Sequence, residues 1–289
     1  MKLLWRAALA VLAAALFAAC SSTSATTPPA GAADASGHRP GKFIWQDLVT
    51  PDPAACRRFY QALLGWEFRD TTRLGHPYAV ASLDGRPVAG IVAPPQPTDE
   101  PAAWLSYVSV ANVDQIVERV SAKGGKTLFA PVDIDVARVA VLEDPQGAVL
   151  GLARMVGDDP PDRAQPARGH FFWMEYLADD APAALAFYSD LLGFESSVHE
   201  TKNGIEYHAL RRDGRTRAGL FQIPEAADKN VDPNWLPYVL VDDPGGLATQ
   251  AESLGGTVIL APEPGIRSGT LAIVADPTGG ALALQKWPL

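Results

Sequence analysis

From residue 43 onward, the chain changes its hydrophobic period from two residues to a helical repeat and back. Alternating apolar and polar side chains over 43–50 predict a half-buried strand. The next segment has apolar residues three and four positions apart, which predicts an amphipathic helix: Phe59, Tyr60, Leu63 and Leu64. Gly65 ends that helix, and three short strands follow with Asp84–Gly85 as a hairpin signal. The pattern therefore predicts a βαβββ unit.

The same order of elements then recurs. A strand at 104–111 leads to a helix at about 113–123, which ends at Gly124–Gly125, and three more strands extend to about residue 155. After a polar, proline-rich stretch, a strand at 170–178 begins the whole series again. The βαβββ unit is thus predicted four times, twice in each half of the chain.

The two halves also share residues at matching positions. Trp45 aligns with Trp173, and Phe59 with Phe187, at an offset of 128 residues. Further collinear matches pair Asp84-Gly85-Arg86 with Asp213-Gly214-Arg215, Trp104-Leu105 with Trp235-Leu236, and Asp144-Pro145-x-Gly147 with Asp276-Pro277-x-Gly279. Such matches indicate an internal duplication. The expected organisation is a leader at 1–20, a flexible tether at 21–41, a first module at 42–156, a linker at 157–168 and a second module at 169–289.

The first twenty residues have the features of an export signal. Lys2 and Arg6 give a positively charged start, and a short apolar run follows. The run Phe17-Ala18-Ala19-Cys20 resembles a bacterial lipobox, in which the cysteine becomes the lipidated, palmitate-bearing first residue. We therefore expect an exported protein anchored to the cell envelope through Cys20. Serine at position 21 is typical of lipoproteins sorted to the periplasmic face of the outer membrane, if the organism is Gram-negative. A soluble secreted protein is the alternative.

Composition changes this picture in two respects. The chain has 24 basic and 33 acidic side chains; loss of Lys2 and Arg6 with the leader leaves 22 basic ones and moves the formal net charge from −9 to near −11. An acidic surface repels phosphate backbones, so nucleic acid is excluded as a partner. Cys56 is alone once Cys20 carries lipid, so no intrachain disulfide is expected.

The Phe-Tyr…Leu-Leu-Gly-Trp run at 59–66 and the closing Asp-Pro-x-Gly at 144–147, with their second copies, resemble the vicinal oxygen chelate superfamily of glyoxalases, bleomycin-resistance proteins and ring-cleaving dioxygenases. The resemblance covers 42–155 and 169–287. It implies an α+β fold of two tandem modules, each a half-open curved barrel of paired βαβββ units with outer helices, that pair within the chain. Enzymes of this superfamily hold a divalent metal in the cleft. Other members bind compounds without metal, so the fold does not decide the function.

The resemblance places metal ligands at four inward-facing strand positions in each module. These positions carry Trp45, Gly90, Leu105 and Gly151 in the first module, and Trp173, Gly219, Leu236 and Ala283 in the second. None of these residues can bind a transition metal, which requires imidazole, carboxylate or thiolate groups. The sequence therefore predicts no metal and no cofactor, with a divalent metal as the alternative.

Residues two positions apart on a strand share a face, which adds more inward-facing side chains. Each cleft is predicted to hold a tryptophan, a carboxylate, a leucine and a tyrosine: Trp45, Asp47, Leu105 and Tyr107 in the first module, and Trp173, Glu175, Leu236 and Tyr238 in the second. An aromatic pocket with few polar groups is typical of a small-molecule site. Alternatively, the two tryptophans fill the space of the absent metal and make each barrel a solid core.

Three functions follow from these features. The leading hypothesis is metal-independent binding of a small aromatic or amphipathic molecule by an envelope lipoprotein, whose membrane contact is its lipid anchor alone. The alternative is a glyoxalase-like lyase or isomerase, or a dioxygenase. Asp47 and Glu175 are then the catalytic candidates, because a desolvated carboxylate can act as a general base. The third is an interaction module with filled clefts.

Overall fold

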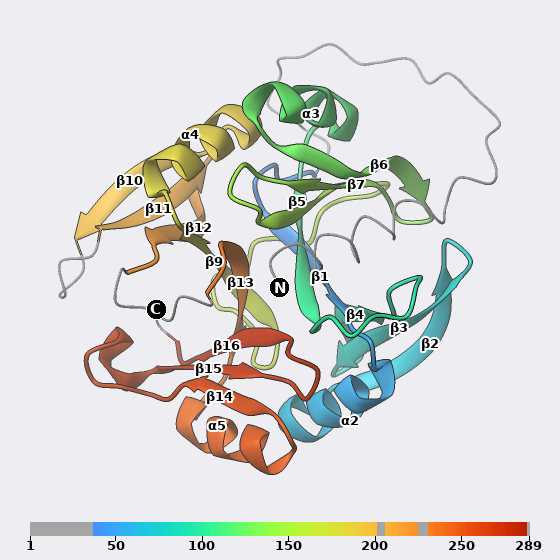
Figure 1. The fold of residues 1–289 in the computed structure, drawn as a ribbon, viewed down its shortest axis with the longest axis vertical. Coiled ribbons are helices and arrows are strands. Elements are labelled where there is room, and N and C mark those ends of the chain that lie inside the picture. The colour runs from blue at the N-terminus through green and yellow to red at the C-terminus, as the bar shows by residue number, and fades with distance from the viewer. Residues whose placement is uncertain (1–36, 201–205, 225–230, 288–289) are drawn as a thin grey trace.

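The computed structural model describes residues 37–200, 206–224 and 231–287, which form two eight-stranded sheets (Figure 1). The predicted leader with Cys20, and the tether up to residue 36, lie outside the described residues. No helix within the described ranges is long and apolar enough to cross a membrane.

Each module contains two βαβββ units, as the hydrophobic pattern predicts. The first module consists of β1 (Phe43–Val49), α2 (Pro53–Leu64), β2 (Glu67–Arg73), β3 (His76–Leu83), β4 (Arg86–Val92), β5 (Ala103–Ser109), α3 (Val113–Val120), the 3-10 turn η1 (Ser121–Lys123), β6 (Lys126–Ile134), β7 (Ala137–Glu143) and β8 (Val149–Met155). The second consists of β9 (Phe171–Ala178), α4 (Ala181–Leu192), β10 (Glu195–Glu200), β11 (Glu206–Arg212), β12 (Arg215–Gln222), β13 (Asn234–Leu240), α5 (Pro244–Ser253), β14 (Thr257–Leu260), the 3-10 turn η2 (Arg267–Gly269), β15 (Leu271–Ala275) and β16 (Ala281–Gln285).

The helices begin and end where capping residues allow. The Asp52 side chain accepts a hydrogen bond from the Ala55 amide at 2.9 Å at the start of α2, where Pro53 occupies the first turn. Gly65 ends α2 with φ 73°, a conformation that favours glycine. The duplicated helix α4 has the same caps, with Asp180 at its start and Gly193 at its end. The repeat thus preserves the local signals that set each helix.

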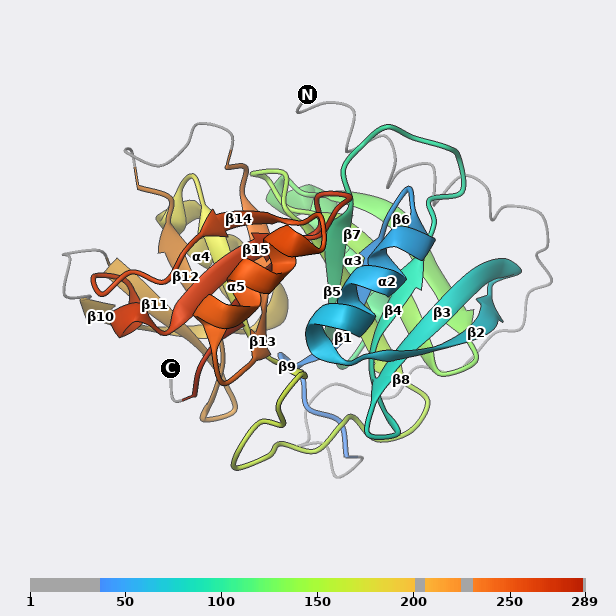
Figure 2. The same ribbon diagram turned by 90° about the horizontal axis from the view of Figure 1, so that it is seen from below.

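The first strands of the two units meet at the centre of each sheet. The strand orders are β2-β3-β4-β1-β5-β8-β7-β6 and β10-β11-β12-β9-β13-β16-β15-β14. β1 is antiparallel to β5 and parallel to β4, and Asp47 lies opposite both Leu105 and Gly90. Each sheet curls around its concave face, with its helices outside (Figures 1 and 2). The predicted α+β half-barrels are confirmed.

The main apolar cores lie between the modules rather than inside either one. One core joins side chains of β5, α3, β7 and β8 to side chains of β9 and α4, and a second joins α2 and its neighbouring strands to α5, β15 and β16. Accordingly α2 lies beside α5, and α3 beside α4 (Figure 1). Each helix therefore packs beside a helix of the other module and keeps one face exposed on the outside of the molecule (Figure 1).

Two reciprocal hydrogen bonds reinforce this packing. The Tyr60 hydroxyl on α2 donates to Asp276 at 2.9 Å, and the Tyr188 hydroxyl on α4 donates to Asp144 at the same distance. Both aspartates open an Asp-Pro-x-Gly motif, and both tyrosines belong to a Phe-Tyr pair. The repeated motifs thus bind each other across the module boundary.

The last residues of the expected tether contact the linker between the modules. The Asp159 carboxylate in the linker accepts the Arg39 amide at 2.5 Å and the Ser109 hydroxyl at 2.5 Å. The Arg39 side chain donates to the Asp159 carbonyl at 2.8 Å. Residues 38–41 therefore dock against the linker, because a buried carboxylate there needs these donors. The composition of this stretch, with no large apolar residue, gave no sign of such contacts.

Candidate functional site

A cavity of about 1180 Å³ lies on the concave face of the first module and continues to the start of β9. Small-molecule sites typically enclose roughly 300–1,000 Å³, so this volume is ample for a ligand. Its wall in the first module is aromatic and aliphatic around one carboxylate: Trp45, Asp47, Tyr78, Tyr107, Phe129, Val139, Val141, Ala153 and Met155. Leu74 and Val136, on two hairpin tips, line it while remaining exposed to solvent.

Asp47 is the polar centre of this cleft. It lies on β1, is 7% exposed, and accepts hydrogen bonds from the Trp45 indole nitrogen at 2.7 Å and the Tyr78 hydroxyl at 2.5 Å. The Tyr107 hydroxyl faces the same carboxylate. Burial raises the pKa of Asp47 because it disfavours the charged form, while the hydrogen bonds from Tyr78 and Trp45 and the charge of Arg73 act against that rise.

Tyrosine side chains occupy the space next to the glycines at the metal positions. A Cβ atom placed on Gly90 would lie 1.8 Å from the Tyr78 hydroxyl oxygen, and one on Gly151 would lie 2.3 Å from the Tyr107 ring. In the second module, a Cβ on Gly219 would lie 2.0 Å from the Tyr207 hydroxyl oxygen. The glycines are therefore needed to admit tyrosine rings, and the tyrosines, rather than the tryptophans, fill these spaces.

The second cleft repeats this arrangement around Glu175 on β9. Its carboxylate accepts a hydrogen bond from the Tyr207 hydroxyl at 2.9 Å and a shorter one from Tyr238. Arg267 of η2 forms a buried ion pair with the same carboxylate. Arg267 and Ser268 have φ values of 45° and 55°, which non-glycine residues rarely adopt. The second carboxylate is thus neutralised by an arginine that a strained loop inserts.

The arginines of the two clefts come from different elements. Arg73 lies on β2 with its guanidinium 4.3 Å from the centre of the Tyr78 ring, whereas Arg267 lies in the loop between β14 and β15. In the sequence repeat Arg73 aligns with Lys202, five residues before the matching tyrosine, whereas Arg267 has no basic counterpart. Tyr78 and Tyr207 do occupy equivalent positions, because both precede their Asp-Gly turn by six residues. This repeated tyrosine could have been found from the sequence.

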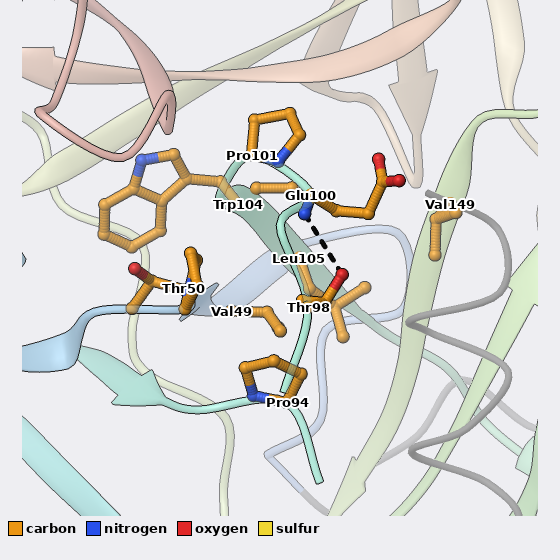
Figure 3. A pocket seen from close by; sticks show the side chains of 11 residues that line it. Val49, Thr50, Pro94, Thr98, Glu100, Pro101, Trp104, Leu105 and Val149 are labelled. Atoms are coloured by element: carbon orange, nitrogen blue, oxygen red, sulfur yellow. Dashed lines mark hydrogen bonds between the residues drawn. The ribbon is translucent and has the colours of Figure 1, made fainter. Parts of the chain in front are cut away.

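The predicted site residues divide between the cavity and the core. Trp45, Asp47 and Tyr107 line the cavity together, and Trp173 lines its far end. The remaining four are buried and do not line this cavity: Leu105, Glu175, Leu236 and Tyr238. Leu105 instead borders a small hollow beneath the loop that carries Thr98 and Glu100 (Figure 3), whose volume of about 20 Å³ suits a single water.

A divalent metal of the kind that the fold implies does not fit these residues. Within the described ranges, no three histidine, cysteine, aspartate or glutamate side chains are grouped so that they could hold a metal ion. Each cleft offers one carboxylate, and hydrogen-bond donors already occupy it. A transition metal needs three or four converging ligands, so the donor set is too small.

Replacement of Asp47 by Asn tests the electrostatics of the cleft. The pKa of Asp47 is raised from 3.8, so the folded protein binds this proton more tightly than the unfolded chain. Stability from this group is therefore fully present below pH 3.8 and is lost as the pH rises through the folded-state value. The free energy of unfolding can be measured with urea between about pH 4 and pH 8. That of Asp47→Asn should increase relative to that of wild type as the pH rises, because the variant has no carboxylate to deprotonate. Asp70→Asn, at an exposed carboxylate on β2, should track wild type; parallel curves for Asp47→Asn would contradict the assignment.

A half-barrel of paired βαβββ units with a cleft on its concave face is the architecture of the vicinal oxygen chelate proteins. The family model of the Glyoxalase/Bleomycin resistance protein/Dioxygenase superfamily matches residues 42–152 and 169–284. The chain therefore belongs to this superfamily, in two tandem copies.

Two relatives align with this chain over nearly their whole length. The chain is 32% identical over 259 residues to a Mycobacterium tuberculosis protein named "Putative glyoxylase CFP32", which covers 87% of this chain and 97% of the relative. It is 28% identical over 262 residues to "Anthracycline biosynthesis protein DnrV" of Streptomyces peucetius, covering 86% and 94%.

Solved structures of similar fold are metal-dependent and oxygen-dependent enzymes by name. The Mn(II)-bound glyoxalase from Novosphingobium aromaticivorans superposes with a TM-score of 0.57 at 14% identity, covering 86% of this chain and 82% of that chain. The 2,2',3-trihydroxybiphenyl 1,2-dioxygenase from Sphingomonas wittichii strain RW1 gives 0.57 at 15% identity, covering 86% and 91%. At such identities the likeness is one of fold.

Proposed function

We propose that the chain binds a small aromatic or amphipathic molecule in the cavity of the first module, without a metal. The observation that carries this proposal is the cavity itself, which combines an aromatic wall with one buried carboxylate and exposes apolar side chains at its hairpin tips. Such a site stabilises a ligand by removing apolar surface from water and by stacking against aromatic rings. Tyr78 and Tyr107 occupy the space beside Gly90 and Gly151, the positions of the metal ligands in the superfamily's enzymes. The Asp47 carboxylate is a hydrogen-bond acceptor there.

Two observations support an aromatic ligand. The name of the Streptomyces relative refers to anthracycline biosynthesis, and anthracyclines are planar, polycyclic aromatic compounds. The cavity of about 1180 Å³ is large enough for a molecule of that class. These points favour an aromatic ligand over a small aliphatic one.

A glyoxalase-like lyase or isomerase, or a dioxygenase, is the second candidate. The observation in its favour is Asp47, whose pKa is raised by burial beside an open cavity, as a general base at neutral pH requires. The name of the mycobacterial relative points the same way. Glu175 is less suited to proton transfer, because Arg267, Tyr207 and Tyr238 already bind its carboxylate.

Titration with phenylnaphthylamine, an uncharged aromatic dye that fluoresces in apolar surroundings, tests the proposal. We expect saturable binding by the wild-type protein and a loss of about 1–3 kcal/mol for Trp45→Ala, the usual value of a buried aromatic contact. Binding should be unchanged after treatment with EDTA, and elemental analysis should find well under one equivalent of metal. The chelator should leave the melting temperature unchanged, because a site without metal contributes no linkage stabilisation.

The control for Trp45→Ala is Trp66→Phe. Trp66 is fully buried between α2 and the second module and does not line the cavity, so its substitution costs stability without touching the ligand. Equal weakening in both variants would indicate a general loss of structure. A stoichiometric metal, with an activity that disappears on chelation and returns on metal addition, would replace binding by the enzymatic alternative.

We also propose that the protein acts in the cell envelope, held there by lipid on Cys20. The support is the run Phe17-Ala18-Ala19-Cys20 behind a positively charged start. Cys20→Ala should leave the leader uncleaved or release the protein from the membrane fraction. Fractionation and mass measurement of the mature protein provide the check, and normal processing with membrane retention of the variant would refute the anchor.

A further inference from the structure

The far end of the cavity lies at the junction of the two modules. It is bounded there by Lys42 before β1, by linker residues 160–163, by His170 and Trp173 at the start of β9, and by Arg217 on β12. The linker passes beneath the start of β9 and the segment that leads into β1 (Figure 2). We call this part of the cavity the junction pocket. It contains none of the residues that hold Asp47 in the first cleft.

Positive charge exceeds negative charge around the junction pocket. Four cations surround the Asp162 carboxylate at 2.7–3.9 Å: Arg217, Lys42, Arg215 and Arg39. Asp159 is the second linker carboxylate near them, and it binds the Arg39 amide and the Ser109 hydroxyl. Even with both carboxylates counted, two positive charges remain unbalanced. Burial lowers the pKa of Lys42, as does the charge of Arg217, whereas Asp162 acts against this.

Buried polar atoms without partners line the same pocket. The Arg217 side chain is 8% exposed; one of its terminal nitrogens binds Asp162 at 2.7 Å, yet its Nε finds no acceptor among the described residues. The indole nitrogen of Trp173 and the Nε2 atom of His170 are likewise buried and without partners in the described part of the chain. The Arg217 Nε and Trp173 indole nitrogens are donors, and a buried donor without an acceptor loses its hydration for no return, so these two atoms call for an acceptor. His170 Nδ1 lies 2.9 Å from the Arg168 carbonyl oxygen and donates to it, so Nε2 of the neutral ring is an acceptor.

The free indole nitrogen of Trp173 is a departure from the repeat. In the first module, the equivalent Trp45 donates to Asp47 at 2.7 Å. In the second module the carboxylate of Glu175 is already bound by Tyr207, Tyr238 and Arg267. Trp173 lines the cavity, and with Arg267 inserted into the second cleft its buried indole nitrogen has no acceptor among the described residues.

We propose that the junction pocket binds the oxyanion of the ligand, so that the ligand is an aromatic acid whose ring body lies in the first cleft. This inference rests on the proposed function, since the first cleft must take the ring body. An oxyanion accepts hydrogen bonds from several donors at once, and a guanidinium edge presents two of them side by side. A carboxylate, sulfonate or phosphate offers this chemistry, whereas a neutral aromatic molecule without an acceptor leaves the Arg217 and Trp173 nitrogens unpaired.

Two dyes with the same ring body separate the two proposals. Anilinonaphthalene sulfonate carries an oxyanion that phenylnaphthylamine lacks. We expect the wild-type protein to bind the sulfonate about tenfold more tightly at low salt, the gain expected of a charge-assisted contact. The preference should shrink as ionic strength rises, because salt screens the charges while leaving the apolar contact intact.

Two variants move the preference in opposite directions. Arg217→Gln should bring the sulfonate down to the affinity of the neutral dye and leave the neutral dye unchanged. Asp162→Asn should raise the affinity for the sulfonate several-fold and leave that for the neutral dye unchanged, because it releases cations that the carboxylate occupies. A loosened protein would instead expose apolar surface and gain affinity for both dyes. Arg211→Gln, at an exposed arginine on β11 outside the cavity, is the charge-matched control and should behave as wild type.

The outcomes distinguish the two proposals. If neither dye binds saturably, the proposed binding function of the first cleft fails. If both dyes bind with equal affinity and Asp162→Asn changes neither, the first cleft binds aromatic molecules but the junction pocket is no oxyanion site. Tighter binding of the sulfonate that is lost in Arg217→Gln and strengthened in Asp162→Asn supports the pocket.

Discussion

Residues 37–160 and 161–289, expressed as separate chains, are expected to give insoluble or unfolded products. The main cores join the modules: Leu142 and Leu150 of the first pack in one cluster with Tyr176 and Leu210 of the second. Exposing each such side chain costs about 1.5–3 kcal/mol. The summed cost of exposing several of them exceeds the free energy of unfolding of a typical domain, which is roughly 5–15 kcal/mol. Solubility and near-ultraviolet circular dichroism of each fragment measure the result.

The control for this experiment keeps both halves present. Arg163, Ala164 and Gln165 are exposed in the linker, so a protease site placed there can be cut after folding. The cut protein should stay associated and keep its melting temperature to within a few degrees, because the cores and the Tyr60–Asp276 and Tyr188–Asp144 hydrogen bonds remain. A soluble, cooperatively unfolding 37–160 fragment would contradict the expectation.

The element order could be predicted because each element has a local signal. Alternating apolar and polar residues predicted β1. Apolar residues three and four positions apart, followed by Gly65, predicted α2. The end of one helix differs from the prediction. The segment expected as a single helix at 113–123 consists of α3, which ends at Val120, and the 3-10 turn η1. Helical and 3-10 turns share one hydrophobic pattern over so few residues, and Gly124 with φ 84° ends the 3-10 turn that continues α3.

The inward face of each cleft was predictable from strand alternation, whereas the contacts across it were not. Trp45 and Asp47 share a face because they are two residues apart on β1. Their partner Tyr78 comes from another strand, and only the sheet register brings its hydroxyl to the carboxylate. The same holds for Gly90, which looked like a lost metal ligand and is needed to admit the Tyr78 ring.

The difference between the two clefts could not be inferred from a duplicated sequence. The duplication predicts equal pockets, yet Arg267 enters the second cleft from a loop that has no counterpart arginine in the first. The tether likewise has a composition typical of flexible chain, although Arg39 docks on Asp159. Both features depend on charges that meet only in the folded molecule.

Asp144→Ala is expected to destabilise the protein by about 3–5 kcal/mol, because several donors lose their acceptor and each buried one left unsatisfied costs roughly 1–3 kcal/mol. Asp144 is 2% exposed and accepts hydrogen bonds from the Tyr176 hydroxyl at 2.5 Å and the Tyr188 hydroxyl at 2.9 Å. It also accepts the amides of Gln146 and Ala148. Alanine would leave three buried donors and the half-buried Gln146 amide without an acceptor, and two of the four come from the other module. The free energy of urea unfolding measures the loss.

The repeat supplies the matched control for this substitution. Asp276 opens the equivalent motif, but the position of Tyr176 is occupied there by Leu48, so Asp276 binds one tyrosine of the partner module rather than two. Its other donors include the Thr278 hydroxyl at 2.7 Å, which lies 3.0 Å from the Thr50 hydroxyl and can turn to it. Asp276→Ala should therefore cost about 1–2 kcal/mol less than Asp144→Ala, the value of the missing buried hydrogen bonds. Equal losses at the two sites would show that the turn amides, and not the tyrosines of the neighbouring module, determine the stability that each aspartate provides.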